Sequence, residues 1–167
     1  MSSEAEQGIL KTLNDLNEKV DIIYKHQCLL ADYSSTPRDY GTGYLMTEIE
    51  AHTLGFISNQ YGITATQLAL ETNRTKGAVS QLISKLESKG LVERVNEPDN
   101  KRIYRIYLTE EGKRACEIHR AYDRANMLDM INKMLQECTA EDIESFFKVL
   151  KCRNKIFERN YEEKIRK

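Results

Sequence analysis

Residues 64–90 read TATQLALETNRTKGAVSQLISKLESKG and contain the start and stop signals of two consecutive helices. Thr64 followed by Gln67 is a capping box, in which two side-chain oxygens accept hydrogen bonds from backbone N–H groups at a helix start. A second helix opens at about Thr75 and stops before Gly90, a residue that favours the left-handed backbone of a helix end. Because a turn of about three residues separates them, the spacing predicts a helix-turn-helix unit.

Two short strands are expected after this unit. Residues 91–95 alternate loosely between apolar and polar side chains, whereas Tyr104, Ile106 and Leu108 alternate cleanly. The segment 97–101, EPDNK, has the composition of a turn. The sequence therefore predicts a hairpin with a polar, basic tip, which is the winged form of a helix-turn-helix.

Long amphipathic helices flank this centre. The first carries an apolar stripe with helical spacing, formed by Ile9, Leu13, Leu16, Val20, Ile23, Gln27 and Leu30. A loop is expected over residues 34–44, and a capping box of Thr47 and Glu50 opens a helix that runs to about Tyr61 and stops at Gly62.

Two further helices are expected after the hairpin. One starts at Thr109 and continues to about Leu135, and the other opens at Thr139 with Asp142 as a capping pair. The last helix keeps one apolar face, formed by Ile143, Phe146, Leu150, Phe157 and Tyr161.

The expected fold class is mainly α with a small β-hairpin wing, that is, a winged helix-turn-helix flanked by long dimerisation helices. Residues 47–108 form the expected DNA-binding region. Residues 1–46 and 109–167 form the expected helical dimerisation region, within one compact domain per chain. The stripes of residues 9–30 and 143–161 are too extensive for the small centre to cover, so a homodimer is favoured over a monomeric bundle.

Charge is concentrated in the predicted winged region. The chain of 167 residues has a formal net charge of −1, but residues 72–105 hold eight basic and four acidic side chains, a net charge of +4. Basic residues gathered on one face are typical of phosphate binding, although a solvated face also collects a few charges by chance.

Other functional classes find less support. The chain has no G-x-S-x-G motif, no Walker-type loop and no G-x-G-x-x-G motif, so an enzyme is not expected. Four widely spaced cysteines form no C-x-x-C pair. Without a signal peptide or an apolar run of about 20 residues, we expect a cytoplasmic protein with no membrane contact.

The outward face of the second helix holds the candidate DNA-binding residues. A helix that enters the major groove needs short or flexible polar side chains there, and Gln81 could pair with adenine and Lys76 with guanine or phosphate. The set is Thr75, Lys76, Gly77, Ala78, Ser80, Gln81, Ser84 and Lys85. An ordinary solvent-facing helix is the alternative. A winged-helix module that binds protein would instead require apolar anchors on this face.

Residues 63–115 closely resemble the MarR family of bacterial winged-helix transcriptional regulators. The most specific pieces are 79–82 (VSQL), 86–94 (LESKGLVER), 99–102 (DNKR) and 108–112 (LTEEG). The resemblance implies a homodimer that binds double-stranded DNA at a pseudo-palindromic operator, usually as a repressor. It also implies that a small molecule, metal or oxidant releases the DNA.

By the same resemblance, Lys101 and Arg102 at the wing reach the minor groove or its phosphates. The chain departs from the family pattern at two places. Gln81 stands where a basic residue is common, and Asn100 precedes the basic pair where an acidic residue is common. Both departures bear on which bases and phosphates are contacted.

The effector site expected from the family lies between the dimerisation helices and the winged region, with no cofactor required. Its candidate residues are Tyr24, Cys28, Tyr33, Tyr44, His52, Phe56, His119 and Tyr122. A zinc site is one alternative, because His52 and His119 fall at positions similar to those of two zinc-binding histidines in the zinc-sensing branch.

Asp123 lies one helical turn beyond His119 and would be a third zinc ligand, with His26 or Asp32 as a fourth. Oxidation of Cys28 is a further alternative. Lys25 and His26 are the only nearby basic residues available to lower the pKa of its thiol.

Overall fold

The computed structural model describes the backbone of residues 16–97 and 100–165 and, within these ranges, all side chains except those of 100–103 and 160–165. By internal contacts the chain divides into two compact units, residues 1–119 and 120–167. The division falls inside one continuous helix, α6 (Glu110–Met134). No helix of the described residues is long and apolar enough to cross a membrane.

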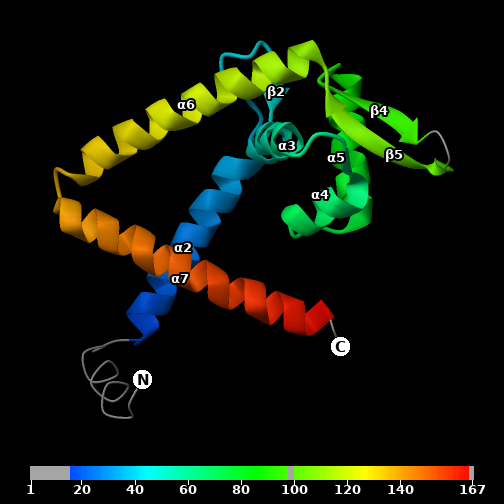
Figure 1. The fold of residues 1–167 in the computed structure, drawn as a ribbon. Coiled ribbons are helices and arrows are strands. Elements are labelled where there is room, and N and C mark those ends of the chain that lie inside the picture. The colour runs from blue at the N-terminus through cyan, green and yellow to red at the C-terminus, as the bar shows by residue number, and fades with distance from the viewer. Residues whose placement is uncertain (1–15, 98–99, 166–167) are drawn as a thin grey trace. The chain divides into compact units, whose positions relative to one another are not determined.

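Three helices and a three-stranded antiparallel sheet form the centre of the first unit (Figure 1). The helices are α3 (Glu48–Asn59), α4 (Ala65–Glu71) and α5 (Lys76–Ser88), and the sheet order is β3 (Ile63–Thr64), β5 (Asn100–Leu108), β4 (Val92–Glu97). Leu54, Leu68, Ile83 and Ile106 are fully buried and come from three helices and the central strand. The expected fold class, a winged helix-turn-helix with long helices, is confirmed.

The capping signals determine where these helices start. Thr47 and Thr64 each accept a hydrogen bond from the N3 backbone and form complete capping boxes with Glu50 and Gln67, as predicted. Thr75 caps α5, also as predicted, by accepting from the backbone N–H of Ala78 at 3.2 Å.

Two glycines allow α5, β4 and α6 to meet closely. Gly90 has a φ of +71° directly after the C-cap of α5, which reverses the chain into β4. A Cβ atom on Gly112 would lie 1.9 Å from the carbonyl oxygen of Leu91, so only glycine permits this approach of α6. Thr109 fixes the same junction, because its hydroxyl donates to the Gly90 carbonyl at 2.7 Å.

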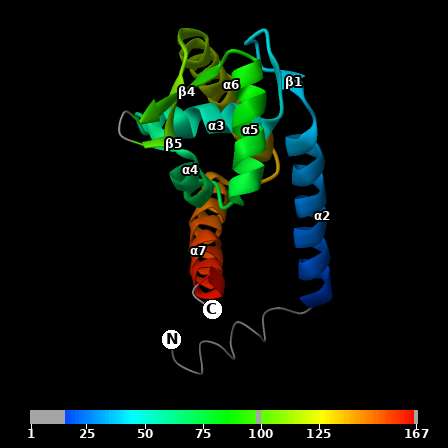
Figure 2. The same ribbon diagram turned by 90° about the vertical axis from the view of Figure 1, so that its right-hand side faces the viewer.

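The first unit also contains the start of α6, helix α2 (Leu16–Ser35) and a small hairpin of β1 (Arg38–Asp39) and β2 (Leu45–Met46). In Figure 2, α2 is seen along its full length beside the winged-helix centre. No described residue of α2 is buried. Asp39 shapes the hairpin loop by accepting from the backbone N–H groups of Gly41 and Gly43 at 2.8 and 3.1 Å.

The second unit contains the end of α6 and helix α7 (Ala140–Ile165). The predicted cap of α7 is present, since Thr139 and Asp142 exchange hydrogen bonds between side chain and backbone. On its apolar face Ile143 is buried, whereas Phe146 and Phe157 are about half exposed, and the side chain of Tyr161 lies outside the described residues.

The structure differs from the sequence-based expectation in short strands and helix ends. The segment 34–44, expected to be a loop, contains the end of α2 and strand β1, and residues 63–64 form β3 where no strand was expected. Helix α3 ends two residues before Tyr61. Strands of two residues carry too little alternation to be detected. Residues 9–15 of the predicted first stripe lie outside the described range, and the predicted boundaries at 47 and 108 stay a prediction.

Candidate nucleic-acid interface and effector site

The two faces of α5 differ sharply in burial. Val79, Leu82, Ile83 and Leu86 are buried at helical spacing and fix which side faces the core. The other side is left to solvent, and Lys76, Gly77, Ser80, Gln81, Ser84 and Lys85 are exposed there, with Thr75 exposed at the cap and Ala78 half-buried. The predicted DNA-binding residues of α5 therefore share one accessible face.

Ser84 has a different environment from its neighbours on this face. Its hydroxyl accepts a hydrogen bond from Nη2 of Arg94 at 2.7 Å, and the Nε of Arg94 lies 3.5 Å from a carboxylate oxygen of Glu87. The Arg94 guanidinium also lies over the Tyr104 ring, 5.1 Å from its centroid. Strand β4 is thus attached to α5 through Arg94, which engages one of the predicted DNA contacts from within the protein.

The basic residues of this region whose side chains the structure describes form two groups. Arg94, Lys89 and Arg105 are paired with other groups of the protein, Arg105 with Glu97 and with the Gly62 carbonyl, to which it donates at 3.0 Å. Exposed cations on or beside α5 are Arg74, Lys76 and Lys85. The net charge of the segment therefore overstates the number of cations available to phosphates.

Lys89 is held at the C-terminal end of α5. Its ammonium donates to a carboxylate oxygen of Glu50 at 2.8 Å and to the Leu45 carbonyl at 2.7 Å. Burial of Glu50 would by itself raise the pKa of its carboxyl. Hydrogen bonds from Lys89 and from the Thr47 backbone, with the positive charges of Lys89 and Lys85, outweigh burial and lower that pKa below its usual value.

The predicted wing contacts can be placed only in part. Lys101 and Arg102 lie on β5 near its paired start, where Asn100 is opposite Glu97. The side chains of Lys101 and Arg102, and residues 98–99 altogether, lie outside the described part of the chain. Their expected contact with DNA stays a prediction.

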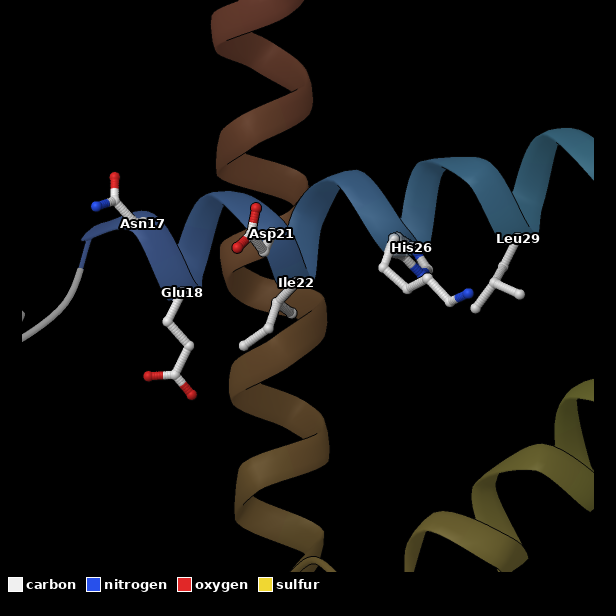
Figure 3. Close-up of a pocket in the computed structure, with 7 residues that line it drawn as sticks. Asn17, Glu18, Asp21, Ile22, His26 and Leu29 are labelled. Carbon is white, nitrogen blue, oxygen red and sulfur yellow. The ribbon is translucent and has the colours of Figure 1, made fainter.

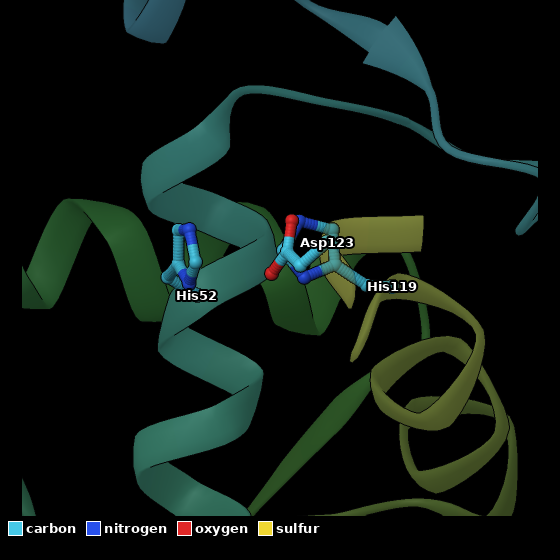
Figure 4. A group of neighbouring side chains, drawn as sticks. All are labelled: His52, His119 and Asp123. Atoms are coloured by element: carbon cyan, nitrogen blue, oxygen red, sulfur yellow. The ribbon is translucent and has the colours of Figure 1, made fainter. Parts of the chain in front are cut away.

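Two histidines and an aspartate converge on one point near α3 (Figure 4). The ligand atoms of His52, on α3, and of His119 and Asp123, one turn apart on α6, all lie within 4.8 Å of one another. His119 is only 2% exposed, and its ring packs edge-on against His52 and Tyr40 with centroid distances of 4.9 and 4.6 Å. Two imidazoles and a carboxylate fit the ligand preference of Zn²⁺.

The groups around His52 suit a metal ligand. Nε2 of His52 lies 3.8 Å from a carboxylate oxygen of Glu48, one turn earlier on α3. A carboxylate beside a metal-binding imidazole is a common way of orienting the ring. His26 and Asp32, predicted as fourth ligands, are not in the cluster that the described residues form.

Only part of the predicted effector pocket is brought together. A cavity of about 330 Å³ between α3 and the turn before α5 is lined by His52 and Phe56 together with Glu48, Ile49, Thr53, Glu71, Thr72, Asn73 and Arg74. Tyr24 and Cys28 are exposed on α2. The Tyr33 ring packs instead against Arg38, whose Cζ lies 3.7 Å from the ring centroid. Tyr44 and Tyr122 are half-buried and do not line this cavity.

A second hollow of about 580 Å³ runs along one side of α2 (Figure 3). Its lining residues are Asn17, Glu18, Asp21, Ile22, Lys25, His26 and Leu29. Ile22 and Leu29 are 56% and 57% exposed, so apolar surface is accessible on this side of the helix. Residue spacing alone does not predict this hollow. The partners of Tyr40 and Lys89 lie far away in the sequence, and those of Arg94 lie across the turn between α5 and β4, so local patterns do not predict the internal roles of these residues.

Comparison with known proteins agrees with this geometry. Residues 46–103 match a family model described as "MarR family". An uncharacterised HTH-type transcriptional regulator of Bacillus subtilis, YhjH, is 31% identical over 84 residues, which is 50% of this chain and 48% of the relative. The chain thus spans about half the length of this curated relative.

Solved structures resemble the chain over most of its length. FabT of Streptococcus pneumoniae, solved in complex with DNA, is 25% identical, with 86% of this chain and 96% of FabT covered at a TM-score of 0.59. ZitR of Lactococcus lactis, a zinc-responsive MarR family member, is 16% identical, with 86% and 99% covered at a TM-score of 0.62. At that identity the likeness to ZitR concerns the fold alone.

Proposed function

We propose that the protein is a transcriptional regulator of the MarR family, whose model matches residues 46–103, and that it binds a pseudo-palindromic operator as a homodimer. Repression is the expected mode, with release of DNA when an effector is bound. The observation that carries the proposal is the accessible polar face of α5, where Lys76, Ser80 and Gln81 are all exposed. This face would contact the major groove of DNA, where each base pair presents a distinct pattern of hydrogen-bond donors and acceptors.

The proposed homodimer is supported by the apolar stripe of α2. Leu16, Val20 and Leu30 are each more than half exposed, and Ile23 is 40% exposed. A second copy of the chain could cover this stripe by a two-fold axis, which would place two α5 helices on half-sites about one turn of DNA apart.

Selection of bound fragments from genomic or random DNA by the purified protein tests this proposal. We expect an enriched inverted repeat whose affinity falls as salt rises, because phosphate contacts release counterions. Lys76→Ala should weaken binding and reduce the salt dependence by about one phosphate contact. His26→Ala, on α2, is the matched control. No enrichment at low salt, with or without zinc, would favour a module that binds protein.

We propose the His52, His119 and Asp123 cluster as the effector site, with zinc as the ligand. The chain supplies two imidazoles and a carboxylate, and a bound Zn²⁺ would hold α3 and α6 together at this point. A small molecule in the cavity beside His52 is the alternative effector, and oxidation of the exposed Cys28 is another.

Zinc binding by dialysed protein distinguishes these effectors. His52→Ala should lower zinc affinity by at least about 100-fold, since second-shell losses alone cost up to that amount. His26→Ala, an exposed histidine outside the cluster, should leave it unchanged. Equal zinc affinity in both variants would exclude this site. If peroxide instead releases the operator from wild-type protein but not from Cys28→Ser, the effector is an oxidant.

A further inference from the structure

Lys89 occupies a position where its charge is unavailable to DNA. It is the C-cap residue of α5, and its ammonium is bound by the Glu50 carboxylate at 2.8 Å and the Leu45 carbonyl at 2.7 Å. The Lys89 side chain is 27% exposed and that of Glu50 only 7%. A cation so satisfied would have to break two hydrogen bonds to reach a phosphate.

The same carboxylate also controls the start of α3. Glu50 accepts the backbone N–H of Thr47 at 3.0 Å, and the Thr47 hydroxyl accepts the backbone N–H of Glu50 at 3.3 Å. One buried carboxylate oxygen therefore ties together the first turn of α3 and the last turn of α5. Because Leu45 belongs to β2, the ammonium adds the hairpin to this connection.

The location of this pair matters for recognition of bases. Base-edge contacts depend on how a helix lies in the groove, whereas phosphate contacts depend mainly on charge. The predicted base-reading residues Lys76 and Gln81 lie on the same helix that ends at Lys89. A change in the angle of α5 relative to α3 would displace them from the base edges.

We propose that Lys89 and Glu50 are positioning residues that hold α5 at the angle required for base-specific contacts. This inference rests on the proposed function, since it concerns the operator. Lys89 contributes to specificity through Glu50 and α3, and not by contacting DNA.

The competing interpretation is that Lys89 binds a phosphate. The two interpretations make opposite predictions for Glu50→Gln. Loss of a buried acidic charge would free Lys89 toward solvent and strengthen DNA binding if only charge mattered. If the pair positions α5, the same substitution weakens recognition of the operator. Glutamine can still accept the Thr47 N–H, so the start of α3 is preserved.

The experiment compares wild-type protein with Glu50→Gln, Lys89→Met and the double variant, using the operator selected by wild-type protein and a scrambled duplex. We expect the ratio of operator to scrambled affinity to fall by about tenfold in all three, roughly the value of one base contact. The slope of affinity against salt should not decrease in Glu50→Gln. Lys76→Met is the charge-matched control, and it should reduce that slope by about one contact.

Folding of each variant is checked by circular dichroism. The double variant is included because each single variant leaves one charge without its partner, whereas the double variant removes both charges. An unchanged ratio in the folded double variant would overturn the positioning role. So would tighter operator binding by Glu50→Gln, or a salt slope lowered by about one contact in Lys89→Met, which would make Lys89 a phosphate contact. A wild-type protein that selects no operator would overturn the proposed function itself, and with it this inference.

Discussion

Helices α5 and α2 both carry an apolar stripe, but only one of them covers it within the chain. On α5, Leu86 is fully buried with three neighbours of the same stripe, whereas on α2, Leu30 is 51% exposed and no described residue is buried. An exposed stripe of this length is uncommon on a monomer. The contrast supports the proposed homodimer, in which α5 packs on the protein's own core and α2 on a second copy of the chain.

Introduction of negative charge into the α2 stripe should have the largest effect. Val20→Asp combined with Ile23→Asp should convert the proposed dimer to monomers, because four apolar side chains across its two-fold interface would each lose about 1.5–3 kcal/mol. Sedimentation equilibrium measures this change, and operator affinity should fall by roughly 1000-fold or more. Lys25→Asp, on the opposite side of α2, is the control. A double variant that stays dimeric would show that this stripe is not the interface.

The same substitution on the two helices should give different kinds of destabilisation. Leu86→Ala should cost about 2–5 kcal/mol of unfolding free energy at every protein concentration, because it leaves a cavity in the core. Leu30→Ala should cost less, and its effect should shrink as the protein is diluted, because the proposed dimer then contributes less to the stability of wild-type protein. Urea unfolding at several concentrations measures both. If the loss of unfolding free energy in Leu30→Ala did not depend on protein concentration, the two helices would not differ in this respect.

The solvent-facing sides of α5 and α2 should also differ in their effect on operator binding. Gln81→Ala on α5 should weaken operator binding by about 10- to 100-fold and relax the preference at one base pair, as expected when a base contact of 1–3 kcal/mol is lost. Lys19→Ala on α2 should change neither. Binding titrations against operators altered at single positions provide the measurement. Equal effects from both variants would mean that α5 does not read bases.

Local signals explain which parts of this contrast the sequence could predict. The capping pairs at Thr47, Thr64 and Thr139 and the stop at Gly90 are complete within a few residues, and all were placed correctly. The buried stripe of α5 follows from spacing alone. Strand β3 was missed, because its two residues are recognisable only through pairing with β5 about 40 positions later.

The candidate site was predictable to the same limited extent. The outward face of α5 and the closeness of His52, His119 and Asp123 agree with the sequence-based interpretation. Which cations are paired within the protein was not predictable from the sequence, because Lys89, for example, pairs with a residue 39 positions away. A count of charges along a chain cannot separate such internal pairs from cations that face solvent. Tyr24, Cys28 and Tyr33 are candidates through the family resemblance, which does not determine whether their side chains share a cavity.

The smallest effect should come from acid. The pKa of Glu50 is lowered from 4.5 despite its burial, mainly by the hydrogen bond from Lys89, so the unfolded chain binds this proton more readily than the folded one. The contribution of Glu50 to stability is therefore complete above pH 4.5 and is lost as the pH falls through the lower folded value. Unfolding free energy measured from neutral pH to about pH 4 should decline less in Glu50→Gln than in wild-type protein.

Other carboxyls titrate in the same range, among them Asp142, whose pKa is lowered by its hydrogen bonds with Thr139. The difference between wild-type protein and Glu50→Gln isolates Glu50, because Asp142 is present in both. Parallel curves would mean that the pair with Lys89 does not favour the charged carboxylate. In that case α5 would depend on its buried stripe alone, and the distinction from α2 would reduce to which apolar face the chain itself covers.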